Sequence, residues 1–181
     1  MVPVLALGVF VHIFYGCYLT WYNIKARGGY RRYETASVAR ADSWSAKNMF
    51  VLGIVILGIL FFHLSHFWAD MQLKEFMGDH AENPYELLTA TFGNIWVLII
   101  YIIWFIAVFF HLTHGFWSMF QTVGWSNQVW MKRLKVIGIL VAAVILVLFT
   151  SVAVNSYSQA YETNMIVINP AQQAYARPDF F

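Results

Sequence analysis

The sequence contains little charge. Of its 181 residues, 11 are Lys or Arg and 9 are Asp or Glu, so 11% of the chain is charged and 60% is hydrophobic. A soluble globular domain carries about 25% charged residues, and this composition therefore excludes an ordinary soluble domain. The net charge of +2 is too small to indicate a particular partner. We expect the chain to lie in a bilayer.

Cysteine and familiar catalytic motifs are also scarce. The one cysteine, Cys17, lies in an apolar run, which excludes a disulfide framework, a cysteine-rich metal site and covalent haem attachment through C-x-x-C-H. The sequence shows no glycine pattern for nucleotide binding, no internal repeat and no Ser-His-Asp arrangement in an identifiable context. The histidines are therefore the main candidates for chemistry.

Four apolar runs are long enough to cross a membrane. A hydrocarbon core about 30 Å thick requires about 20 helical residues, and open strands cannot span lipid with unpaired backbone groups. The runs cover Val2–Tyr22, Met49–Trp68, Ile95–Phe120 and Leu134–Val154. The sequence predicts an all-α transmembrane helical bundle over residues 1–155, with four spans, followed by a polar C-terminal tail over residues 156–181.

The basic residues determine the expected orientation of the helices. Nine of the 11 Lys and Arg residues lie between the first two runs or at the start of the fourth, whereas five acidic residues accompany Lys74 between the second and third. Lys and Arg favour the cytoplasmic side, so the N-terminus is expected outside. No charged residue precedes the first run, which also lacks the features of a signal peptide. We therefore expect that an upstream helix is missing from this chain.

Five of the six histidines lie in or at the ends of the predicted spans. They are His12, His63, His66, His111 and His114, whereas His80 lies in the outer loop and is interpreted as solvated. Ionisable side chains inside a membrane are energetically costly, and they usually mark function or pair with each other. Each could instead hydrogen-bond to a neighbouring helix, and the tryptophans near the span ends fit an interfacial belt.

Counting along the helices places two histidines at a similar depth. His12 lies 13 residues before Lys25, about 20 Å of helix, and His111 lies 10 residues before Gln121, about 15 Å. His63 lies about 24 Å from the inner end of its own helix and belongs to an outer layer. Two imidazoles at matched depth suit the axial positions of a haem iron better than a compact metal cluster.

Small residues next to these histidines leave room for a flat macrocycle. A residue four positions from a histidine shares its helix face, and at this spacing Gly16 follows His12 and Gly115 follows His111. The residues expected around the haem, without ligating it, are Gly16, Gly115, His66 and His114.

Three groups of motifs resemble one family of membrane cytochromes. They are G-x-x-x-H-x-x-x-G over residues 8–16 with N-x-x-A-R over 23–27, N-M-F-V-L-G over 48–53 with H-L-S-H-F-W over 63–68, and F-H-L-T-H-G-F-W-S-M-F-Q-T-V-G over 110–124. From residue 1 to about residue 150, the chain resembles the membrane cytochrome b subunit of succinate dehydrogenase and fumarate reductase. The resemblance is to the five-helix b558 branch, which holds two haems.

The resemblance implies specific roles for three histidines. His12 and His111 would be the axial ligands of the inner haem, and His63 would ligate the outer haem. The usual partner of His63 lies on the first helix of the family, whereas the four runs here correspond to family helices two to five. We therefore expect that the chain is cut short at an internal methionine; otherwise the outer haem is five-coordinate, differently ligated or lost.

The resemblance also implies a place in a respiratory complex of the bacterial cytoplasmic membrane. Electrons from succinate would pass through a flavoprotein and an iron–sulfur subunit to haem b and on to a quinone, with menaquinone as the type that this branch implies. The chain itself would do no chemistry on the dicarboxylate, and nucleic acid is not an expected partner. Four basic residues are expected to dock the iron–sulfur subunit, unless they serve only to fix the topology. They are Lys25, Arg27, Lys132 and Arg133.

Two other functions stay open on these residues. The chain could be the cytochrome b anchor of another respiratory dehydrogenase, or a transporter whose histidines line a path for metal ions or protons. Co-purified subunits would distinguish the first, and reduced-minus-oxidised spectra the second.

Overall fold

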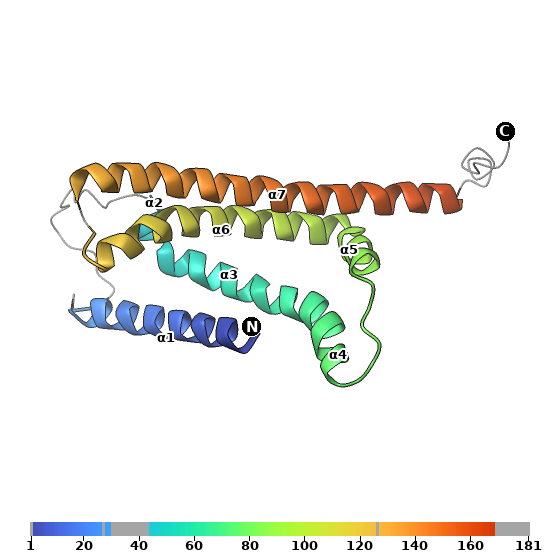
Figure 1. Cartoon of the computed structure of the whole chain (residues 1–181), viewed down its shortest axis with the longest axis horizontal. Coiled ribbons are helices and arrows are strands. Elements are labelled where there is room, and N and C mark those ends of the chain that lie inside the picture. Colours follow the sequence, from blue (N-terminus) through green and yellow to red (C-terminus); the bar gives the residue numbers. More distant parts are fainter. Residues whose placement is uncertain (1, 27, 30–43, 126, 169–181) are drawn as a thin grey trace. The chain divides into compact units, whose positions relative to one another are not determined.

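The computed structural model describes residues 2–26, 28–29, 44–125 and 127–168, within two compact units, Met1–Ile54 and Val55–Phe181. Every regular element in these ranges is helical, which confirms the all-α prediction. Four of the helices are long and apolar enough to cross a membrane, as predicted, and Figure 1 shows them along the chain. They are Val2–Ala26, Met49–Phe76, Ile95–Thr122 and Gln128–Met165.

The first unit contains α1 (Val2–Ala26), α2 (Trp44–Lys47) and the beginning of α3 (Met49–His63). No side chain of α1 is buried within the described structure, which suits an apolar helix surrounded by hydrocarbon. Gly28 and Gly29 follow α1 with φ angles of 73° and 126°. Their amides donate to the carbonyls of Lys25 and Ile24 at 3.1 and 3.0 Å, which is the helix ending that glycine favours.

The second unit contains the rest of the helices. After α3 come a π-helix, η1 (Leu64–Leu73), the short α4 (Lys74–Phe76), α5 (Pro84–Phe92), α6 (Ile95–Thr122) and α7 (Gln128–Ile168). Helices α6 and α7 lie side by side along most of the length of α6, and α5 packs against both (Figure 1). Asparagine caps begin α5, α6 and α7: the side-chain oxygens of Asn83, Asn94 and Asn127 accept the amides of Tyr85, Trp96 and Val129 at 2.9–3.0 Å.

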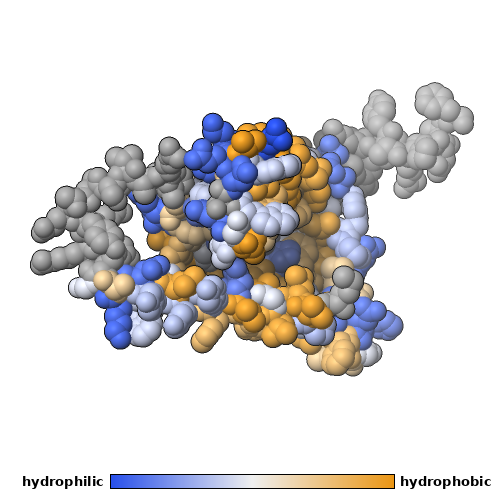
Figure 2. Space-filling view, turned by 60° about the vertical axis from the view of Figure 1, so that its left-hand side comes forward, coloured by the Kyte–Doolittle hydropathy of each residue, from blue (hydrophilic) through white to orange (hydrophobic). Residues whose placement is uncertain are grey.

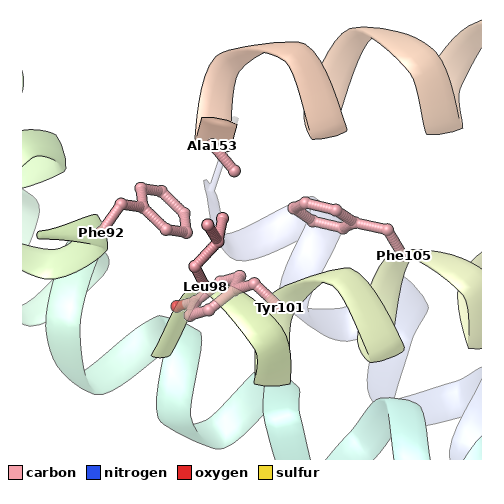
Figure 3. Packing of buried hydrophobic residues seen from close by; sticks show 5 residues of the cluster. All are labelled: Phe92, Leu98, Tyr101, Phe105 and Ala153. Carbon is pink, nitrogen blue, oxygen red and sulfur yellow. The ribbon is translucent and has the colours of Figure 1, made fainter. Parts of the chain in front are cut away.

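A cluster of aromatic and aliphatic side chains joins α5, α6 and α7. Figure 3 shows Ala153 of α7 pointing toward Leu98 and Tyr101 of α6, with the rings of Phe92 and Phe105 on either side. Tyr101 and Ala153 are each only 1% exposed. The rings of Phe92 and Tyr101 meet edge to face with centroids 5.0 Å apart, a geometry that contributes about 0.5–1.5 kcal/mol beyond area burial.

A small residue brings α6 and α7 together nearer the other end of α6. A Cβ atom built on Gly138 of α7 would lie 3.0 Å from Cδ1 of Phe116 and 3.3 Å from its Cβ and Cγ. Glycine at position 138 therefore lets the ring of Phe116 approach the backbone of α7. Close approach at small residues is a common way for helices to associate in membranes, where apolar burial against lipid gives little driving force.

Two elements differ from the sequence predictions in their extent or form. The fourth predicted span, Leu134–Val154, lies within a longer helix, because no proline or glycine follows Gly138 until Pro170. Residues 156–168, expected in the polar tail, continue α7, and residues 169–181 lie outside the described ranges. The second predicted span, Met49–Trp68, also continues helically to Phe76, with π geometry over Leu64–Leu73.

Large apolar side chains remain exposed on the helices. Leu140, Val144, Val147 and Leu148 follow one face of α7 at helical spacing and are 58–65% exposed. Figure 2 shows hydrophobic side chains over much of the visible surface, interspersed with hydrophilic ones. An apolar surface of this extent is unfavourable in water and suits contact with hydrocarbon.

Candidate functional site

A cavity of about 470 Å³ lies among the helices of the second unit. Its volume falls within the range of about 300–1,000 Å³ that is usual for small-molecule and cofactor sites. His63, at the end of α3, is its histidine, and η1, α5, α6 and α7 contribute apolar walls. We call it the His63 cavity; its lining includes Phe67, Phe92, Tyr101, Trp104, Phe105, Phe109, Leu146 and Phe149.

Aromatic rings surround the imidazole of His63. Its ring centroid lies 5.1 Å from that of Phe67, 5.4 Å from that of Trp104 and 6.2 Å from that of Tyr101. These rings come from η1 and α6, so packing between two helices sets the position of the imidazole. The result is an imidazole with largely apolar surroundings.

Three polar atoms at this cavity are buried without a hydrogen-bond partner among the described residues. They are Nδ1 of His63, the hydroxyl oxygen of Tyr101 and Nε1 of Trp104. Each buried group left unpaired costs about 1–3 kcal/mol, so three in one cavity call for an explanation. The indole N–H can only donate, whereas the hydroxyl and the imidazole can donate or accept. A ligand with acceptor atoms could satisfy all three.

The π-helix η1 begins directly after His63 and contains the second histidine of this segment, His66. Nδ1 of His66 lies 3.0 Å from the carbonyl oxygen of Phe62 and 3.3 Å from the hydroxyl oxygen of Ser65. Because a carbonyl oxygen can only accept, this contact places the proton of the imidazole on Nδ1 and leaves Nε2 as the acceptor nitrogen. Segments of π-helix are frequent at functional sites. The bond holds His66 in one orientation next to the cavity-lining His63.

The remaining predicted site residues lie on three helices. His12 and Gly16 belong to α1 in the first unit, and a Cβ atom at Gly16 would meet nothing within 4 Å. His111, His114 and Gly115 belong to α6 in the second unit. The His114 ring packs edge-on against Trp117, with centroids 4.9 Å apart. The pairing of His12 with His111 stays a prediction.

Three of the predicted docking residues, Lys25, Lys132 and Arg133, lie near helix ends. Nζ of Lys25 is 5.2 Å from the ring centroid of Trp21, and Cζ of Arg133 is 5.3 Å from that of Trp130. Lys132 is exposed near the start of α7, and Arg27 lies outside the described ranges. Such pairs of cations with tryptophan are typical of the membrane–water interface. These pairs are compatible both with docking of a partner subunit and with a role that only fixes the topology.

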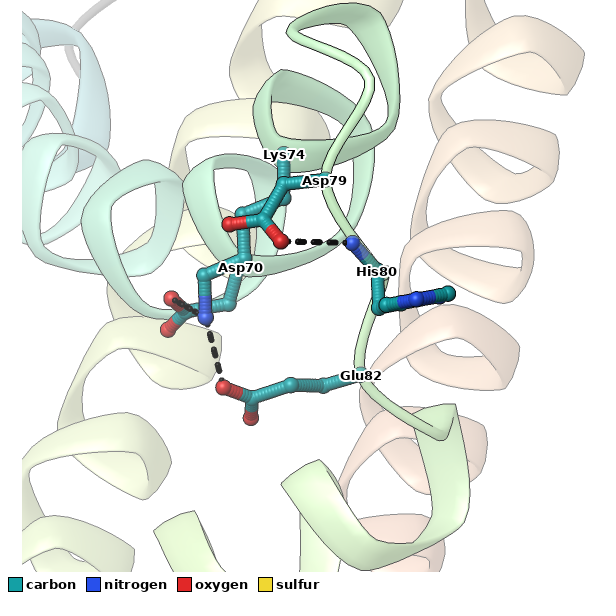
Figure 4. Close-up of polar contacts among 5 residues, drawn as sticks. All are labelled: Asp70, Lys74, Asp79, His80 and Glu82. Atoms are coloured by element: carbon teal, nitrogen blue, oxygen red, sulfur yellow. Dashed lines mark hydrogen bonds and ion pairs between the residues drawn. The ribbon is translucent and has the colours of Figure 1, made fainter.

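An ion-pair cluster occupies the connection between η1 and α5. Figure 4 shows Nζ of Lys74 between the carboxylates of Asp70 and Glu82, at 2.9 and 2.6 Å. The backbone amide of His80 donates to Oδ1 of Asp79 at 2.8 Å. The cluster fixes the loop to the end of the helix, and the exposed ring of His80 agrees with its interpretation as solvated.

Sequence reasoning did not single out Tyr101 and Trp104, the two aromatic residues with unpaired polar atoms. A signal was available in the segment I-I-Y-I-I-W-F over residues 99–105, because tyrosine and tryptophan usually lie at span ends. Their positions two to three turns inside α6 place polar atoms where water is scarce. Within the described residues, no three His, Cys, Asp or Glu side chains come together to hold a metal ion. A haem iron needs only one or two axial side chains.

The four long apolar helices make the chain a multi-pass helical membrane protein. Its second unit holds a cavity with a buried histidine and aromatic walls. No protein-family model, curated protein or solved structure matches the chain.

Proposed function

We propose that the chain is the membrane-anchor cytochrome b subunit of a succinate:quinone oxidoreductase. It would pass electrons between an iron–sulfur subunit and menaquinone through b-type haem in the bacterial cytoplasmic membrane. The observation that carries the proposal is the His63 imidazole within an apolar, aromatic cavity of about 470 Å³. Supporting it are the sequence motifs around His12, His63 and His111, which resemble the haem-ligand segments of that family.

The residues of the His63 cavity fit a b-type haem. An imidazole can serve as an axial ligand, and flat aromatic side chains such as Phe67 and Trp104 suit the faces and edges of a macrocycle. Bound haem would supply a reversible one-electron couple. The apolar walls would limit the access of water to that site, and the low polarity they create would influence the reduction potential. The cavity offers one imidazole, so a second axial ligand would come from outside its lining.

The inner haem is proposed between His12 and His111, with Gly16 and Gly115 allowing close approach to the helix backbones. His66 and His114 would lie in the haem surroundings, where hydrogen bonds tune ligands and propionates. The chain would bind no dicarboxylate; it would hold haem, insulate it and bind the quinone. The proposed contact with the iron–sulfur subunit uses Lys25, Arg27, Lys132 and Arg133.

The test is a reduced-minus-oxidised spectrum of the complex purified from native membranes, followed by three histidine variants. We expect a b-type α band in the parent. His12→Ala and His111→Ala should each remove the same low-spin signal, whereas His63→Ala should remove a different one. His80→Ala, in the exposed loop, is the matched control and should change neither signal.

Several results would contradict the proposal. Absence of an α band in the native complex excludes the haem function and favours a transporter. A low-spin signal that survives both His12→Ala and His111→Ala overturns the ligand assignment. Co-purification with subunits that oxidise formate or hydrogen, instead of succinate, identifies a different dehydrogenase.

A further inference from the structure

A second, smaller cavity lies at the connection between α6 and α7. Its volume is about 280 Å³, and it is lined by Trp125, Asn127, Trp130 and Leu134. We call it the Trp130 cavity. It lies far along the chain from the His63 cavity lining on α6 and contains none of the residues proposed to ligate haem.

The chemistry of the Trp130 cavity combines indole rings with positive charge. Trp125 and Trp130 are 67% and 54% exposed, and Cζ of Arg133 lies 5.3 Å from the ring centroid of Trp130. Farther along α7, Nζ of Lys135 lies 4.3 Å from the ring centroid of Trp117. Guanidinium groups pair with phosphate through two parallel hydrogen bonds, and indoles favour the depth of lipid head groups.

No acidic side chain is available nearby in the sequence to neutralise these cations. The chain contains no Asp or Glu between Glu86 and Glu162, a stretch that includes all of α6 and most of α7. By contrast, the basic residue at the other end of the second unit, Lys74, is paired with two carboxylates. Cations next to a cavity and without acidic residues in their own segment favour an external anion.

The position of the cavity indicates what kind of anion it meets. Helix α6 ends at Thr122 and α7 begins at Gln128, so the short connection between two membrane spans must lie at the bilayer surface. Lipid phosphates are at that level. Basic pockets between membrane helices are known to bind anionic lipid head groups.

We propose that the Trp130 cavity binds the phosphate of an anionic phospholipid, with Arg133 as its cationic partner and the indoles of Trp125 and Trp130 as its walls. Arg133 and Lys135 both add positive charge beside the cavity without lining it. Lys132 is the matched control for Arg133. It lies two residues from both Trp130 and Leu134, and residues two apart on a helix point to different faces. The lipid site therefore predicts a strong effect at position 133 and a weak one at position 132.

Native mass spectrometry of the full chain tests the proposal. The protein is partly delipidated in detergent and then exposed to phosphatidylglycerol or phosphatidylcholine. We expect one retained phosphatidylglycerol and a clear preference over phosphatidylcholine. Since a basic residue near an anionic surface contributes about a fivefold gain in affinity, Arg133→Gln should lower the preference about fivefold and Arg133→Gln/Lys135→Gln about 25-fold.

Matched variants distinguish lipid binding at the Trp130 cavity from a general attraction of lipid to surface charge. Lys132→Gln removes the same charge from another face, and Lys25→Gln removes the cation next to Trp21 on α1, which does not line the Trp130 cavity. Each should lower the preference less than Arg133→Gln does, because neither cation lies against a ring that lines the Trp130 cavity. Trp130→Ala, with every charge intact, should lose the retained lipid. Circular dichroism confirms that each variant is folded.

Four outcomes would overturn the inference. They are equal retention of the two lipids, an equal loss in Lys132→Gln and Arg133→Gln, and competition by inorganic phosphate alone, which would make the cavity a free phosphate site. The fourth is displacement of the lipid when the iron–sulfur subunit binds, which would leave Arg133 with the proposed subunit contact alone. The haem spectra do not depend on any of these outcomes, so haem binding and lipid binding fail independently.

Discussion

The imidazole of His63 and the indole of Trp104 lie against each other at the His63 cavity, with ring centroids 5.4 Å apart and planes inclined by 41°. Each ring carries a buried nitrogen with no hydrogen-bond partner among the described residues. The contact joins the end of α3 to α6, the helix that also provides Tyr101. Apolar packing thus holds these polar atoms at the wall of the cavity.

The hydroxyl of Tyr101 gives the first prediction. Tyr101→Phe keeps the ring and removes a buried group without a partner, so it should raise the free energy of unfolding of the ligand-free protein by about 1 kcal/mol. Thermal unfolding in detergent measures the change. Tyr85→Phe is the control, because the side chain of Tyr85 is 57% exposed and its hydroxyl reaches solvent. Destabilisation by Tyr101→Phe would mean that the hydroxyl has a partner.

The hydrogen bond of His66 gives the second prediction. His66→Asn can still donate to the carbonyl of Phe62 and should keep both the haem spectrum and the stability of the parent. His66→Ala loses the bond and should lower the free energy of unfolding by about 1 kcal/mol while the α band remains. Absorption spectra and melting curves of both variants measure these effects. Loss of a haem signal in His66→Asn would make His66 a ligand, contrary to its proposed place in the surroundings.

The contact between Gly138 and Phe116 gives the third prediction. Gly138→Ala places a methyl group 3.0–3.3 Å from the Phe116 side chain and should destabilise the α6–α7 pair by about 1–3 kcal/mol. Phe116→Leu in the same chain should recover part of the loss, which a double-mutant cycle would show.

Gly58 of α3 provides the control for Gly138. A Cβ atom at Gly58 would meet nothing within 4 Å, so Gly58→Ala should stabilise the helix by about 0.5–1 kcal/mol through backbone entropy alone. Equal effects of the two alanines on the melting temperature would contradict the close contact.

The ion pairs of Lys74 give the fourth prediction. The side chain of Lys74 is 31% exposed and that of Asp70 is 33% exposed, so solvent screens the interaction. Lys74→Gln should therefore lower the free energy of unfolding only slightly, and about 1 M salt should remove most of the difference. Melting curves at low and high salt measure both effects. A large loss that salt does not change would assign Lys74 a role other than the ion pairs.

The number and type of the membrane helices could be predicted from the sequence, because 20-residue apolar runs have one stable form in lipid. The π geometry of η1 could not, since a shift from i→i+4 to i→i+5 hydrogen bonding leaves no mark on composition. Helix α5 was missed although Asn83 and Pro84 are a typical start, because its nine residues are too short to show periodicity. Length and hydropathy therefore predicted spans but not the shorter elements between them.

The candidate site was predictable only in part. Depth along the helix identified His63 as a residue apart from His12 and His111, and the structure places it in a cavity. The partners Tyr101 and Trp104 could not be assigned because their positions next to His63 depend on how α6 packs against α3 and η1. Tertiary packing of this kind brings together residues about 40 positions apart, which no local pattern encodes.

Helix α7 has 41 residues and is therefore about 62 Å long, twice the thickness of a hydrocarbon core of about 30 Å. Its far part is braced by α5, where a Cβ atom on Gly93 would lie 3.2 Å from the Cβ of Ala160. Two positions on α7 are therefore separated by a distance that the helix itself sets. A dye at Gln128 and another at Tyr161 would be held about 50 Å apart by one continuous helix, so each would report its own height relative to the bilayer. A change in membrane thickness would then appear as a change in the tilt of α7, measured from the heights of the two dyes.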